Sequence, residues 1–146
     1  MPRFVVKKAV GRIPLFGLAY RRLGHVLLDR SKGAEAHRSL ADAAVRIGRR
    51  WSLYIAPEGT FARNADPTWL GPFKTGAFEY AQAAGVPVVP VALFGTDLLW
   101  PPDSWRLQPG VVTVVYGPPI HEPDPTVRRE LARTWLASTL AQGQLI

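Results

Sequence analysis

Short runs of β-branched and other apolar residues alternate along this chain with segments whose apolar residues follow the helical period. Strands are predicted at residues 4–6, 25–28, 52–56, 87–94 and 111–116. Helices are predicted at residues 15–23, 34–50, 73–84 and 126–140, the third of them closed by Gly85. Strands that alternate with helices favour a mixed, partly parallel sheet flanked by helices, so we expect an α/β fold.

Length and composition limit the number of domains and the kinds of site that the chain can form. The 146 residues, 47% of them hydrophobic, can bury one core but are too few for two ordinary domains, so we expect one domain over residues 1–146. Within the last predicted helix, the apolar residues expected to face this core are Val127, Leu131, Trp135 and Leu140. The absence of cysteine excludes a disulfide framework, a thiolate zinc site and a cysteine nucleophile, and we expect no metal site.

The apolar runs are too short for a membrane span. The longest, residues 86–94, contains two prolines and is far below the roughly 20 residues that a spanning helix needs. The first residues lack the long apolar region of a signal peptide, since Lys7 and Lys8 interrupt them. We therefore expect neither a membrane-spanning nor a secreted protein, with a reducing cytoplasm favoured.

Positive charge is concentrated near the N-terminus. Of the net charge of +7, residues 1–50 carry +9, from 12 Lys or Arg and three acids, and the remainder carries −2. Such a basic third suits a phosphorylated metabolite, an anionic membrane surface or nucleic acid. It also fits a solvated basic face without a partner, and charge alone does not separate these interpretations.

Three ordered sequence blocks resemble the glycerolipid acyltransferase family, of the lysophosphatidic acid acyltransferase type. The first spans residues 4–30 and contains Ile13-Pro14-Leu15-Phe16-Gly17. The second is Ala56-Pro57-Glu58-Gly59-Thr60-Phe61, extended by Phe73-Lys74-Thr75-Gly76. The third is Gly85-Val86-Pro87-Val88-Val89-Pro90-Val91-Ala92-Leu93. Their order and spacing across residues 4–94 make the resemblance specific, although each block alone is a weak signal.

The resemblance implies a glycerol-3-phosphate acyltransferase-like fold and a reaction. A fatty acyl group would move from a thioester on coenzyme A or acyl carrier protein to a lysophosphatidic acid-like glycerol phosphate, in phospholipid biosynthesis. The thioester is a co-substrate, and no bound cofactor is expected. We expect a cytoplasmic protein, peripherally associated with the anionic inner membrane face, with acyl carrier protein as one candidate partner. No nucleic acid is expected, because the sequence has no recognition motif or cluster of stacking aromatic residues.

The same resemblance assigns site residues. It places Glu58 and Gly59 in the catalytic turn, where glycine allows close backbone approach to a polar substrate. The expected substrate-binding residues are Lys8, Arg30, Thr60, Arg63 and Lys74, and an acyl path is expected along Val86, Pro87 and Val88. These last three also fit an ordinary core strand.

Two of these assignments carry alternatives. A guanidinium at a strand end suits a phosphate, but Arg30 could instead pair with Asp29 or Glu35. Many relatives have arginine where this chain has Phe61, so Arg63 or Lys74 would have to supply that charge.

Trp100 and Trp105 fit either a membrane interface or inward packing.

The family's general base is a histidine that four intervening residues separate from a following aspartate, before the first block, and no such pair precedes residue 4. His37 and Asp42 have the required gap, but they follow the first block and lie about 140° apart on a predicted helix, so we reject them. His25 and His121 are expected to be structural. The hypotheses left open are an acyltransferase whose base lies upstream, a catalytically inactive lipid- or phosphate-binding fragment, and a basic nucleic-acid-binding domain.

Overall fold

The computed structural model describes residues 2–28, 42–45, 47, 50–59, 69–101, 104 and 106–143. The elements, in chain order, are β1 (Arg3–Lys7), the 3-10 helix η1 (Lys8–Arg12), α1 (Phe16–Arg22), β2 (Val26–Leu28), β3 (Leu53–Tyr54), α3 (Gly76–Ala83), β4 (Val91–Phe94), α4 (Thr96–Leu99), β5 (Thr113–Tyr116) and α5 (Pro125–Gly143). Residues 42–45 and 47 are also helical. Strands and helices alternate, as the apolar pattern predicts.

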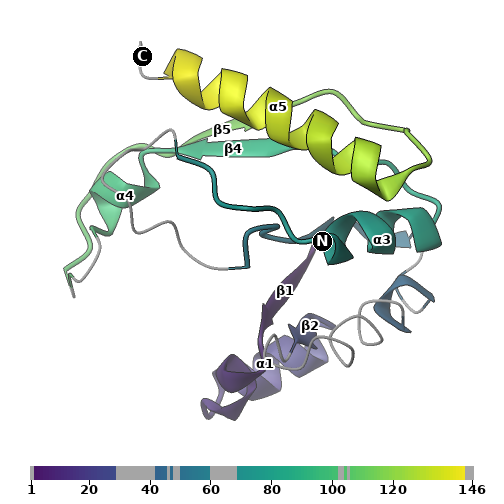
Figure 1. Ribbon diagram of the computed structural model, residues 1–146. Helices are drawn as coiled ribbons and strands as arrows, with labels where there is room; N and C mark the ends of the chain where they lie inside the picture. Colours follow the sequence, from purple (N-terminus) through teal and green to yellow (C-terminus); the bar gives the residue numbers. More distant parts are fainter. Residues whose placement is uncertain are drawn as a thin grey trace.

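The first three strands form a parallel sheet in the order β2-β1-β3 (Figure 1). Val5 lies beside Val26 across one strand pair, and Phe4 lies beside Tyr54 across the other. The chain therefore passes from β1 to a neighbour on one side and then to a neighbour on the other. All three strands end at the same edge of the sheet.

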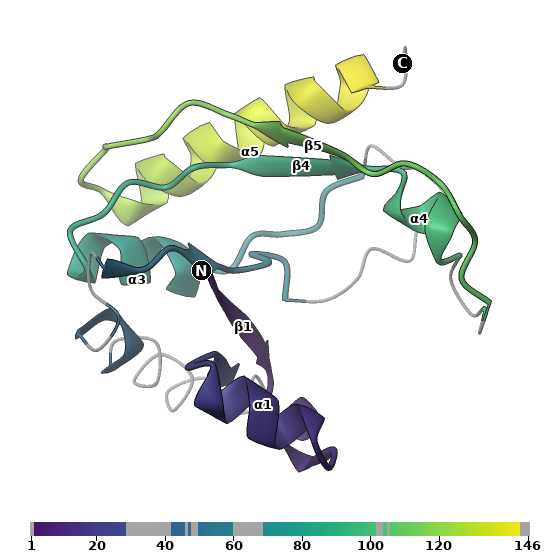
Figure 2. The same cartoon turned by 180° about the vertical axis from the view of Figure 1, so that it is seen from behind.

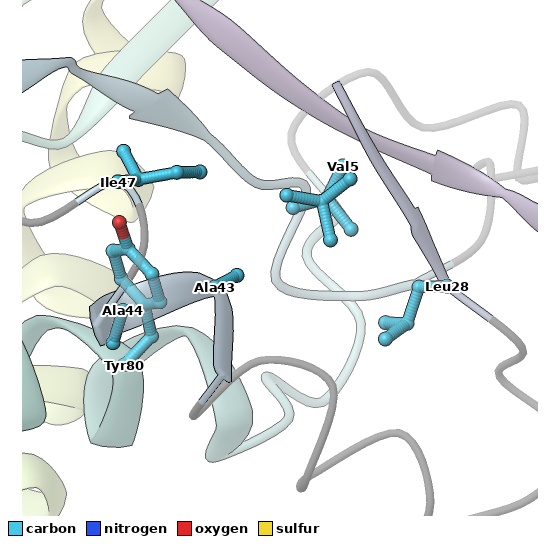
Figure 3. Packing of buried hydrophobic residues seen from close by; sticks show 7 residues of the cluster. Val5, Leu28, Ala43, Ala44, Ile47 and Tyr80 are labelled. Atoms are coloured by element: carbon cyan, nitrogen blue, oxygen red, sulfur yellow. The ribbon is translucent and has the colours of Figure 1, made fainter. Parts of the chain in front are cut away.

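Side chains that alternate along β1 build the two faces of this sheet. Val5 is buried and packs with Val26, Leu28 and the helical residues 43, 44 and 47 (Figure 3). Tyr80 of α3 completes this first core. Phe4 points to the other face and stacks on Tyr54, with ring centroids 5.4 Å apart.

The remaining strands, β4 and β5, pair antiparallel, and α5 packs along β4 (Figure 2). Helix α3 lies against α5, and the two enclose a second core of Phe73, Phe78 and Ala132. Within the described residues, the three parallel strands and the antiparallel pair β4 and β5 belong to separate sheets. The expected mixed, partly parallel α/β fold is confirmed.

Several elements are shorter than predicted. The strand expected over residues 87–94 begins only at Val91, after a single bridge between Val88 and Ile120, because prolines 87 and 90 have no N–H to donate. The helix expected from residue 73 begins at Gly76, since the Lys74 amide donates to the Pro57 carbonyl at 2.9 Å instead of joining a helical ladder. Strand β3 is likewise shorter than residues 52–56, and it is half-buried.

The expected orientation of the last helix was wrong in part. Val127 and Leu131 are 44% and 48% exposed, whereas Arg128 and Ala132 are buried. The guanidinium of Arg128 reaches inward and donates to the carbonyls of Glu122 (Nε, 2.6 Å) and Val86 (Nη1, 3.1 Å). A long side chain whose charged end finds such acceptors can occupy a face that simple polarity assigns to solvent.

No helix in the described part of the chain is both long enough and apolar enough to cross a membrane.

Candidate active site

Three of the predicted site residues follow the carboxyl ends of the three parallel strands in the sequence. Lys8 follows β1 directly and is exposed, and Glu58 follows β3 after four residues. Arg30 follows β2 by two residues but lies outside the described residues, as do Thr60 and Arg63. Ligands of α/β proteins commonly bind at such an edge, where the chain turns to opposite sides of the sheet.

Glu58 is held in place by a neighbouring loop. Its Oε2 accepts a hydrogen bond from the amide of Gly71 at 3.0 Å, and the carboxylate is half-buried. Gly71 is itself buried, and a Cβ added there would lie 2.8 Å from this oxygen and 3.1 Å from the ring of Trp69. The side chain at position 71 must therefore be absent for the carboxylate to keep this position.

Gly59 and Lys74 also meet in this turn. Gly59 has φ +72°, a left-handed conformation that favours glycine, and its amide donates to the Ala56 carbonyl at 3.2 Å. The Lys74 side chain runs across its α-carbon, so that a Cβ added to Gly59 would lie 3.1 Å from Nζ. The Glu58 carboxylate and the Lys74 ammonium group are thus both presented at this turn, although the two residues lie 16 positions apart in the sequence.

Sequence reasoning missed Gly71 and Trp69, which shape the turn from its far side. Gly71 precedes Pro72, and a Gly-Pro pair marks a loop, so the position was visible as punctuation. Its role as an amide donor to Glu58 was not visible, because nothing local in the sequence pairs residue 71 with residue 58.

The predicted acyl path lies at the other end of α3. Val88 packs in the second core and exchanges backbone hydrogen bonds with Ile120, at 3.1 and 2.8 Å. The Val86 carbonyl accepts from Arg128, and Pro87 is exposed. These contacts fit the core-strand interpretation, and the acyl path remains a prediction.

Two histidines, His25 and His121, lie within the described part of the chain. Nδ1 of His25 accepts a hydrogen bond from the Phe4 amide at 3.1 Å, and its ring packs between Phe4 and Tyr20. Burial, and then the nearby Arg3 guanidinium, lower the pKa of His25 below 6.5. His121 is exposed beyond the Val88 bridge. His37 lies outside the described residues, and Asp42 is exposed, as expected of a helix surface.

Comparison with known proteins settles the family. The model of the family described as Acyltransferase matches residues 1–94, which contain all three sequence blocks. The chain belongs to the acyltransferase family. The resemblance noted in the sequence is thereby confirmed.

Relatives of this acyltransferase include several plant and bacterial proteins. The chain is 40% identical over 124 residues to the 1-acyl-sn-glycerol-3-phosphate acyltransferase of Limnanthes douglasii, a match that covers 84% of this chain and 43% of that protein. It is 41% identical over 117 residues to the protein of the same name from Escherichia coli K12, covering 80% and 46%. The chain thus spans less than half the length of these two relatives.

A solved structure supports the fold. The crystal structure of the 1-acyl-sn-glycerophosphate acyltransferase PlsC from Thermotoga maritima superposes with a TM-score of 0.72, over 98% of this chain and 57% of that one. At 24% identity this likeness shows the acyltransferase fold alone.

Proposed function

We propose that this protein transfers a fatty acyl group from a thioester to a lysophosphatidic acid-like glycerol phosphate, in phospholipid biosynthesis. The observation that carries the proposal is the family match together with the turn that holds Glu58, Gly59 and Lys74 at the carboxyl edge of the parallel strands. The relatives at about 40% identity are 1-acyl-sn-glycerol-3-phosphate acyltransferases by name.

The acceptor would bind through its charged end at this edge. We assign the phosphate to Arg30, whose planar fork can hold two oxygens, with Lys8 after the neighbouring strand adding positive charge. Glu58 and the Gly59 backbone would face the glycerol hydroxyls. Thr60, Arg63 and Lys74 would complete the contacts to the acceptor, and Lys74 already lies across Gly59.

The chemical step needs a general base. The acceptor hydroxyl attacks the thioester carbonyl and gives its proton to a histidine, which an aspartate orients, and the thiolate departs as the ester forms. Of the described histidines, His25 precedes β2 and uses Nδ1 to accept from the Phe4 amide, and His121 follows the bridge between Val88 and Ile120. We therefore assign the base to a His-x4-Asp segment upstream of residue 4, as in the family.

The donor and the membrane partner belong to the same proposal. Coenzyme A and acyl carrier protein both present an acyl thioester, and either would serve as co-substrate. The basic N-terminal third suits work at an anionic inner membrane face in the cytoplasm, where the lysophospholipid is found. A bound cofactor has no part in this reaction.

The test compares two forms of the protein with acyl-CoA, then acyl carrier protein, as donor. The 146-residue chain should transfer acyl groups at least about 10²-fold more slowly than a form extended upstream by a His-x4-Asp segment, since a general base contributes about 10²–10⁴-fold. Equal rates would overturn the assignment of the base. If neither form acylates lysophosphatidic acid yet both bind it, the protein is an inactive lipid-binding relative and the proposed activity is wrong.

The acceptor assignment is tested with Arg30 in the extended form. Arg30→Ala should weaken the use of lysophosphatidic acid by about 2–5 kcal/mol, with partial rescue by Arg30→Lys. A monoacylglycerol, which lacks the phosphate, is the control acceptor and should be little affected. Equal losses with both acceptors would mean that Arg30 does not hold the phosphate.

A further inference from the structure

Helix α1 and the turn before it expose an unusual amount of apolar surface. The apolar side chains between 47% and 81% exposed in this segment are Ile13, Leu15, Phe16, Leu18 and Leu23. We call Ile13, Leu15, Phe16 and Leu23, with the basic residues of the same segment, the α1 face. Leu18 lies about 160° around the helix from Phe16 and is not part of this face. In both views α1 lies at the end of the molecule opposite α5, so within the described residues no packed element covers this face (Figures 1 and 2).

A strained turn directs the apolar side chains outward. Leu15 has φ 67° and ψ −53°, and the Phe16 amide donates to the Pro14 carbonyl at 2.8 Å, which makes a γ-turn centred on Leu15. Such a conformation is rare for a residue with a side chain and persists where the surroundings impose it. Its result is that Leu15, 81% exposed, stands at the tip of the segment beside Phe16.

The orientation of α1 is fixed from beneath. Gly17 is buried, and a side chain there would collide with the carbonyl of Gly11 in η1. This close approach turns Phe16, Ala19 and Leu23, spaced i, i+3 and i+7, to one exposed side of the helix. The apolar face therefore belongs to a rigid part of the fold.

The segment that carries these apolar residues is strongly basic. Residues 2–28 contain six Lys or Arg and no Asp or Glu. Arg3 stacks on the Trp51 ring at 4.6 Å, and the other five side chains are exposed: Lys7, Lys8, Arg12, Arg21 and Arg22. No acidic side chain in the described part of the chain pairs with any of these five. Long basic side chains can reach lipid headgroups while their stems lie along apolar surface.

We propose that the α1 face is the surface by which this protein docks on an anionic lipid bilayer, with Leu15 and Phe16 inserted at the level of the headgroups. Exposed apolar side chains on a basic segment match the two attractions that hold an interfacial segment on such a membrane. The inference names the membrane contact of the proposed function and rests on it, but binding to vesicles is measured without any acyl transfer.

Another exposed apolar region, around α4, suits this partner less well. Around α4, the exposed residues Leu98, Trp100 and Leu107 are accompanied, among the described residues of 95–112, by one acid, Asp97, and one base, Arg106. That region lacks the charge that would favour an anionic surface. It therefore provides matched controls.

The charge test uses co-sedimentation of the protein with vesicles of phosphatidylglycerol and phosphatidylcholine. Arg12→Gln with Arg22→Gln should weaken partitioning about 25-fold, since each basic residue near such a surface contributes roughly fivefold. Arg106→Gln with Arg133→Gln changes the net charge equally but away from the α1 face, and should leave binding nearly unchanged. Raising the salt concentration should weaken vesicle binding by the parent protein and abolish most of the difference between the parent and the Arg12→Gln, Arg22→Gln variant.

The apolar test separates a membrane role from a structural one. Leu15→Gly should weaken vesicle binding about tenfold, the effect of removing one largely inserted leucine, while Tm stays equal or rises because glycine accepts a positive φ. Leu107→Gly, which removes a side chain 74% exposed near α4, should not change binding.

Three results would overturn the proposal. The first is an equal loss of vesicle binding from Arg12→Gln with Arg22→Gln and from Arg106→Gln with Arg133→Gln. The second is a loss of vesicle binding with Leu107→Gly but not with Leu15→Gly. The third is that Arg12→Gln with Arg22→Gln leaves vesicle binding unchanged but weakens binding of an acidic carrier protein. Acyl transfer to a detergent-dispersed acceptor should be unaffected by Arg12→Gln with Arg22→Gln. A protein that binds vesicles through this face but transfers no acyl group would refute the proposed function alone.

Discussion

The Glu58 carboxylate is fixed by the amide of Gly71, with 3.0 Å between Oε2 and the amide nitrogen. The carboxylate comes from the turn after a parallel strand, and the amide comes from the loop that leads to α3. A hydrogen bond to a charged acceptor contributes more than one between neutral groups. This bond therefore makes the carboxylate's position depend on residue 71.

Gly71→Ala should disturb the carboxylate without unfolding the protein. The added methyl group would lie 2.8 Å from Oε2 and would push the carboxylate away. We expect kcat/KM for acyl transfer in the upstream-extended form to fall about 10-fold or more, toward the value of Glu58→Ala, since small displacements of a positioned group are costly. Gly110→Ala, which meets only the flexible end of Leu99, is the control. A kinetically silent Gly71→Ala would show that Glu58 does not need this anchor.

Gly59→Ala and Gly85→Ala form a matched pair. Both glycines have positive φ, +72° and +62°, and each substitution should lower the unfolding free energy by about 1–2 kcal/mol in urea titrations. Only Gly59 has Lys74 against it, whereas a Cβ on Gly85 would meet nothing within 4 Å. Gly59→Ala should therefore also raise KM for the phosphorylated acceptor, and Gly85→Ala should not. Equal KM values for Gly59→Ala and Gly85→Ala would show that Lys74 does not contribute to acceptor binding.

Tyr80→Phe should leave the protein as stable as before, or more stable by up to about 1 kcal/mol. The Tyr80 ring is buried in the first core, and its hydroxyl has no hydrogen-bond partner among the described residues. Burial raises the pKa of this hydroxyl, so it stays neutral and still lacks a partner. Removing a buried polar group without a partner is not destabilising. A clear loss in Tm would reveal a partner for the hydroxyl outside the described residues.

Stability should fall as the pH drops through the range in which His25 titrates. The folded-state pKa of His25 is below its ordinary 6.5, so the unfolded chain binds the proton first. The contribution of neutral His25 is complete above pH 6.5 and is lost as the pH falls through the lowered folded-state value. His25→Asn keeps an acceptor for the Phe4 amide and removes the titration, so unfolding free energies from pH 5 to 8 should slope less in this variant. Parallel pH profiles would contradict the assignment.

The order and type of the main elements could be predicted from the sequence because their apolar periods are strong. The strand at residues 4–6 and the helix at residues 15–23 agree with β1 and α1 to within one residue at each end. The face of α5 could not be predicted, since burial of Arg128 depends on two carbonyls, one of them 42 residues away in sequence. Short elements such as α4 carry too few residues for a period to show.

The candidate site residues were named from the family resemblance and not from apolar periods. Glu58, Gly59 and Lys74 stand in sequence blocks, and the structure brings Lys74 to Gly59. The roles of these residues remain predictions. Gly71 escaped notice because it acts through its backbone, and a backbone amide is the same at every position except proline.

Helix α3 contributes side chains to both hydrophobic cores. Phe78 belongs to one cluster and Tyr80 to the other, and they lie two residues apart, about 160° around the helix. Regions with separate cores can open separately, whereas an element common to both opens only when both are disrupted. Amide hydrogens of α3 should therefore exchange among the slowest in the molecule. The loop that carries Gly71 and Lys74 leads directly into this helix, so the turn around Glu58 is anchored to the most persistent part of the fold.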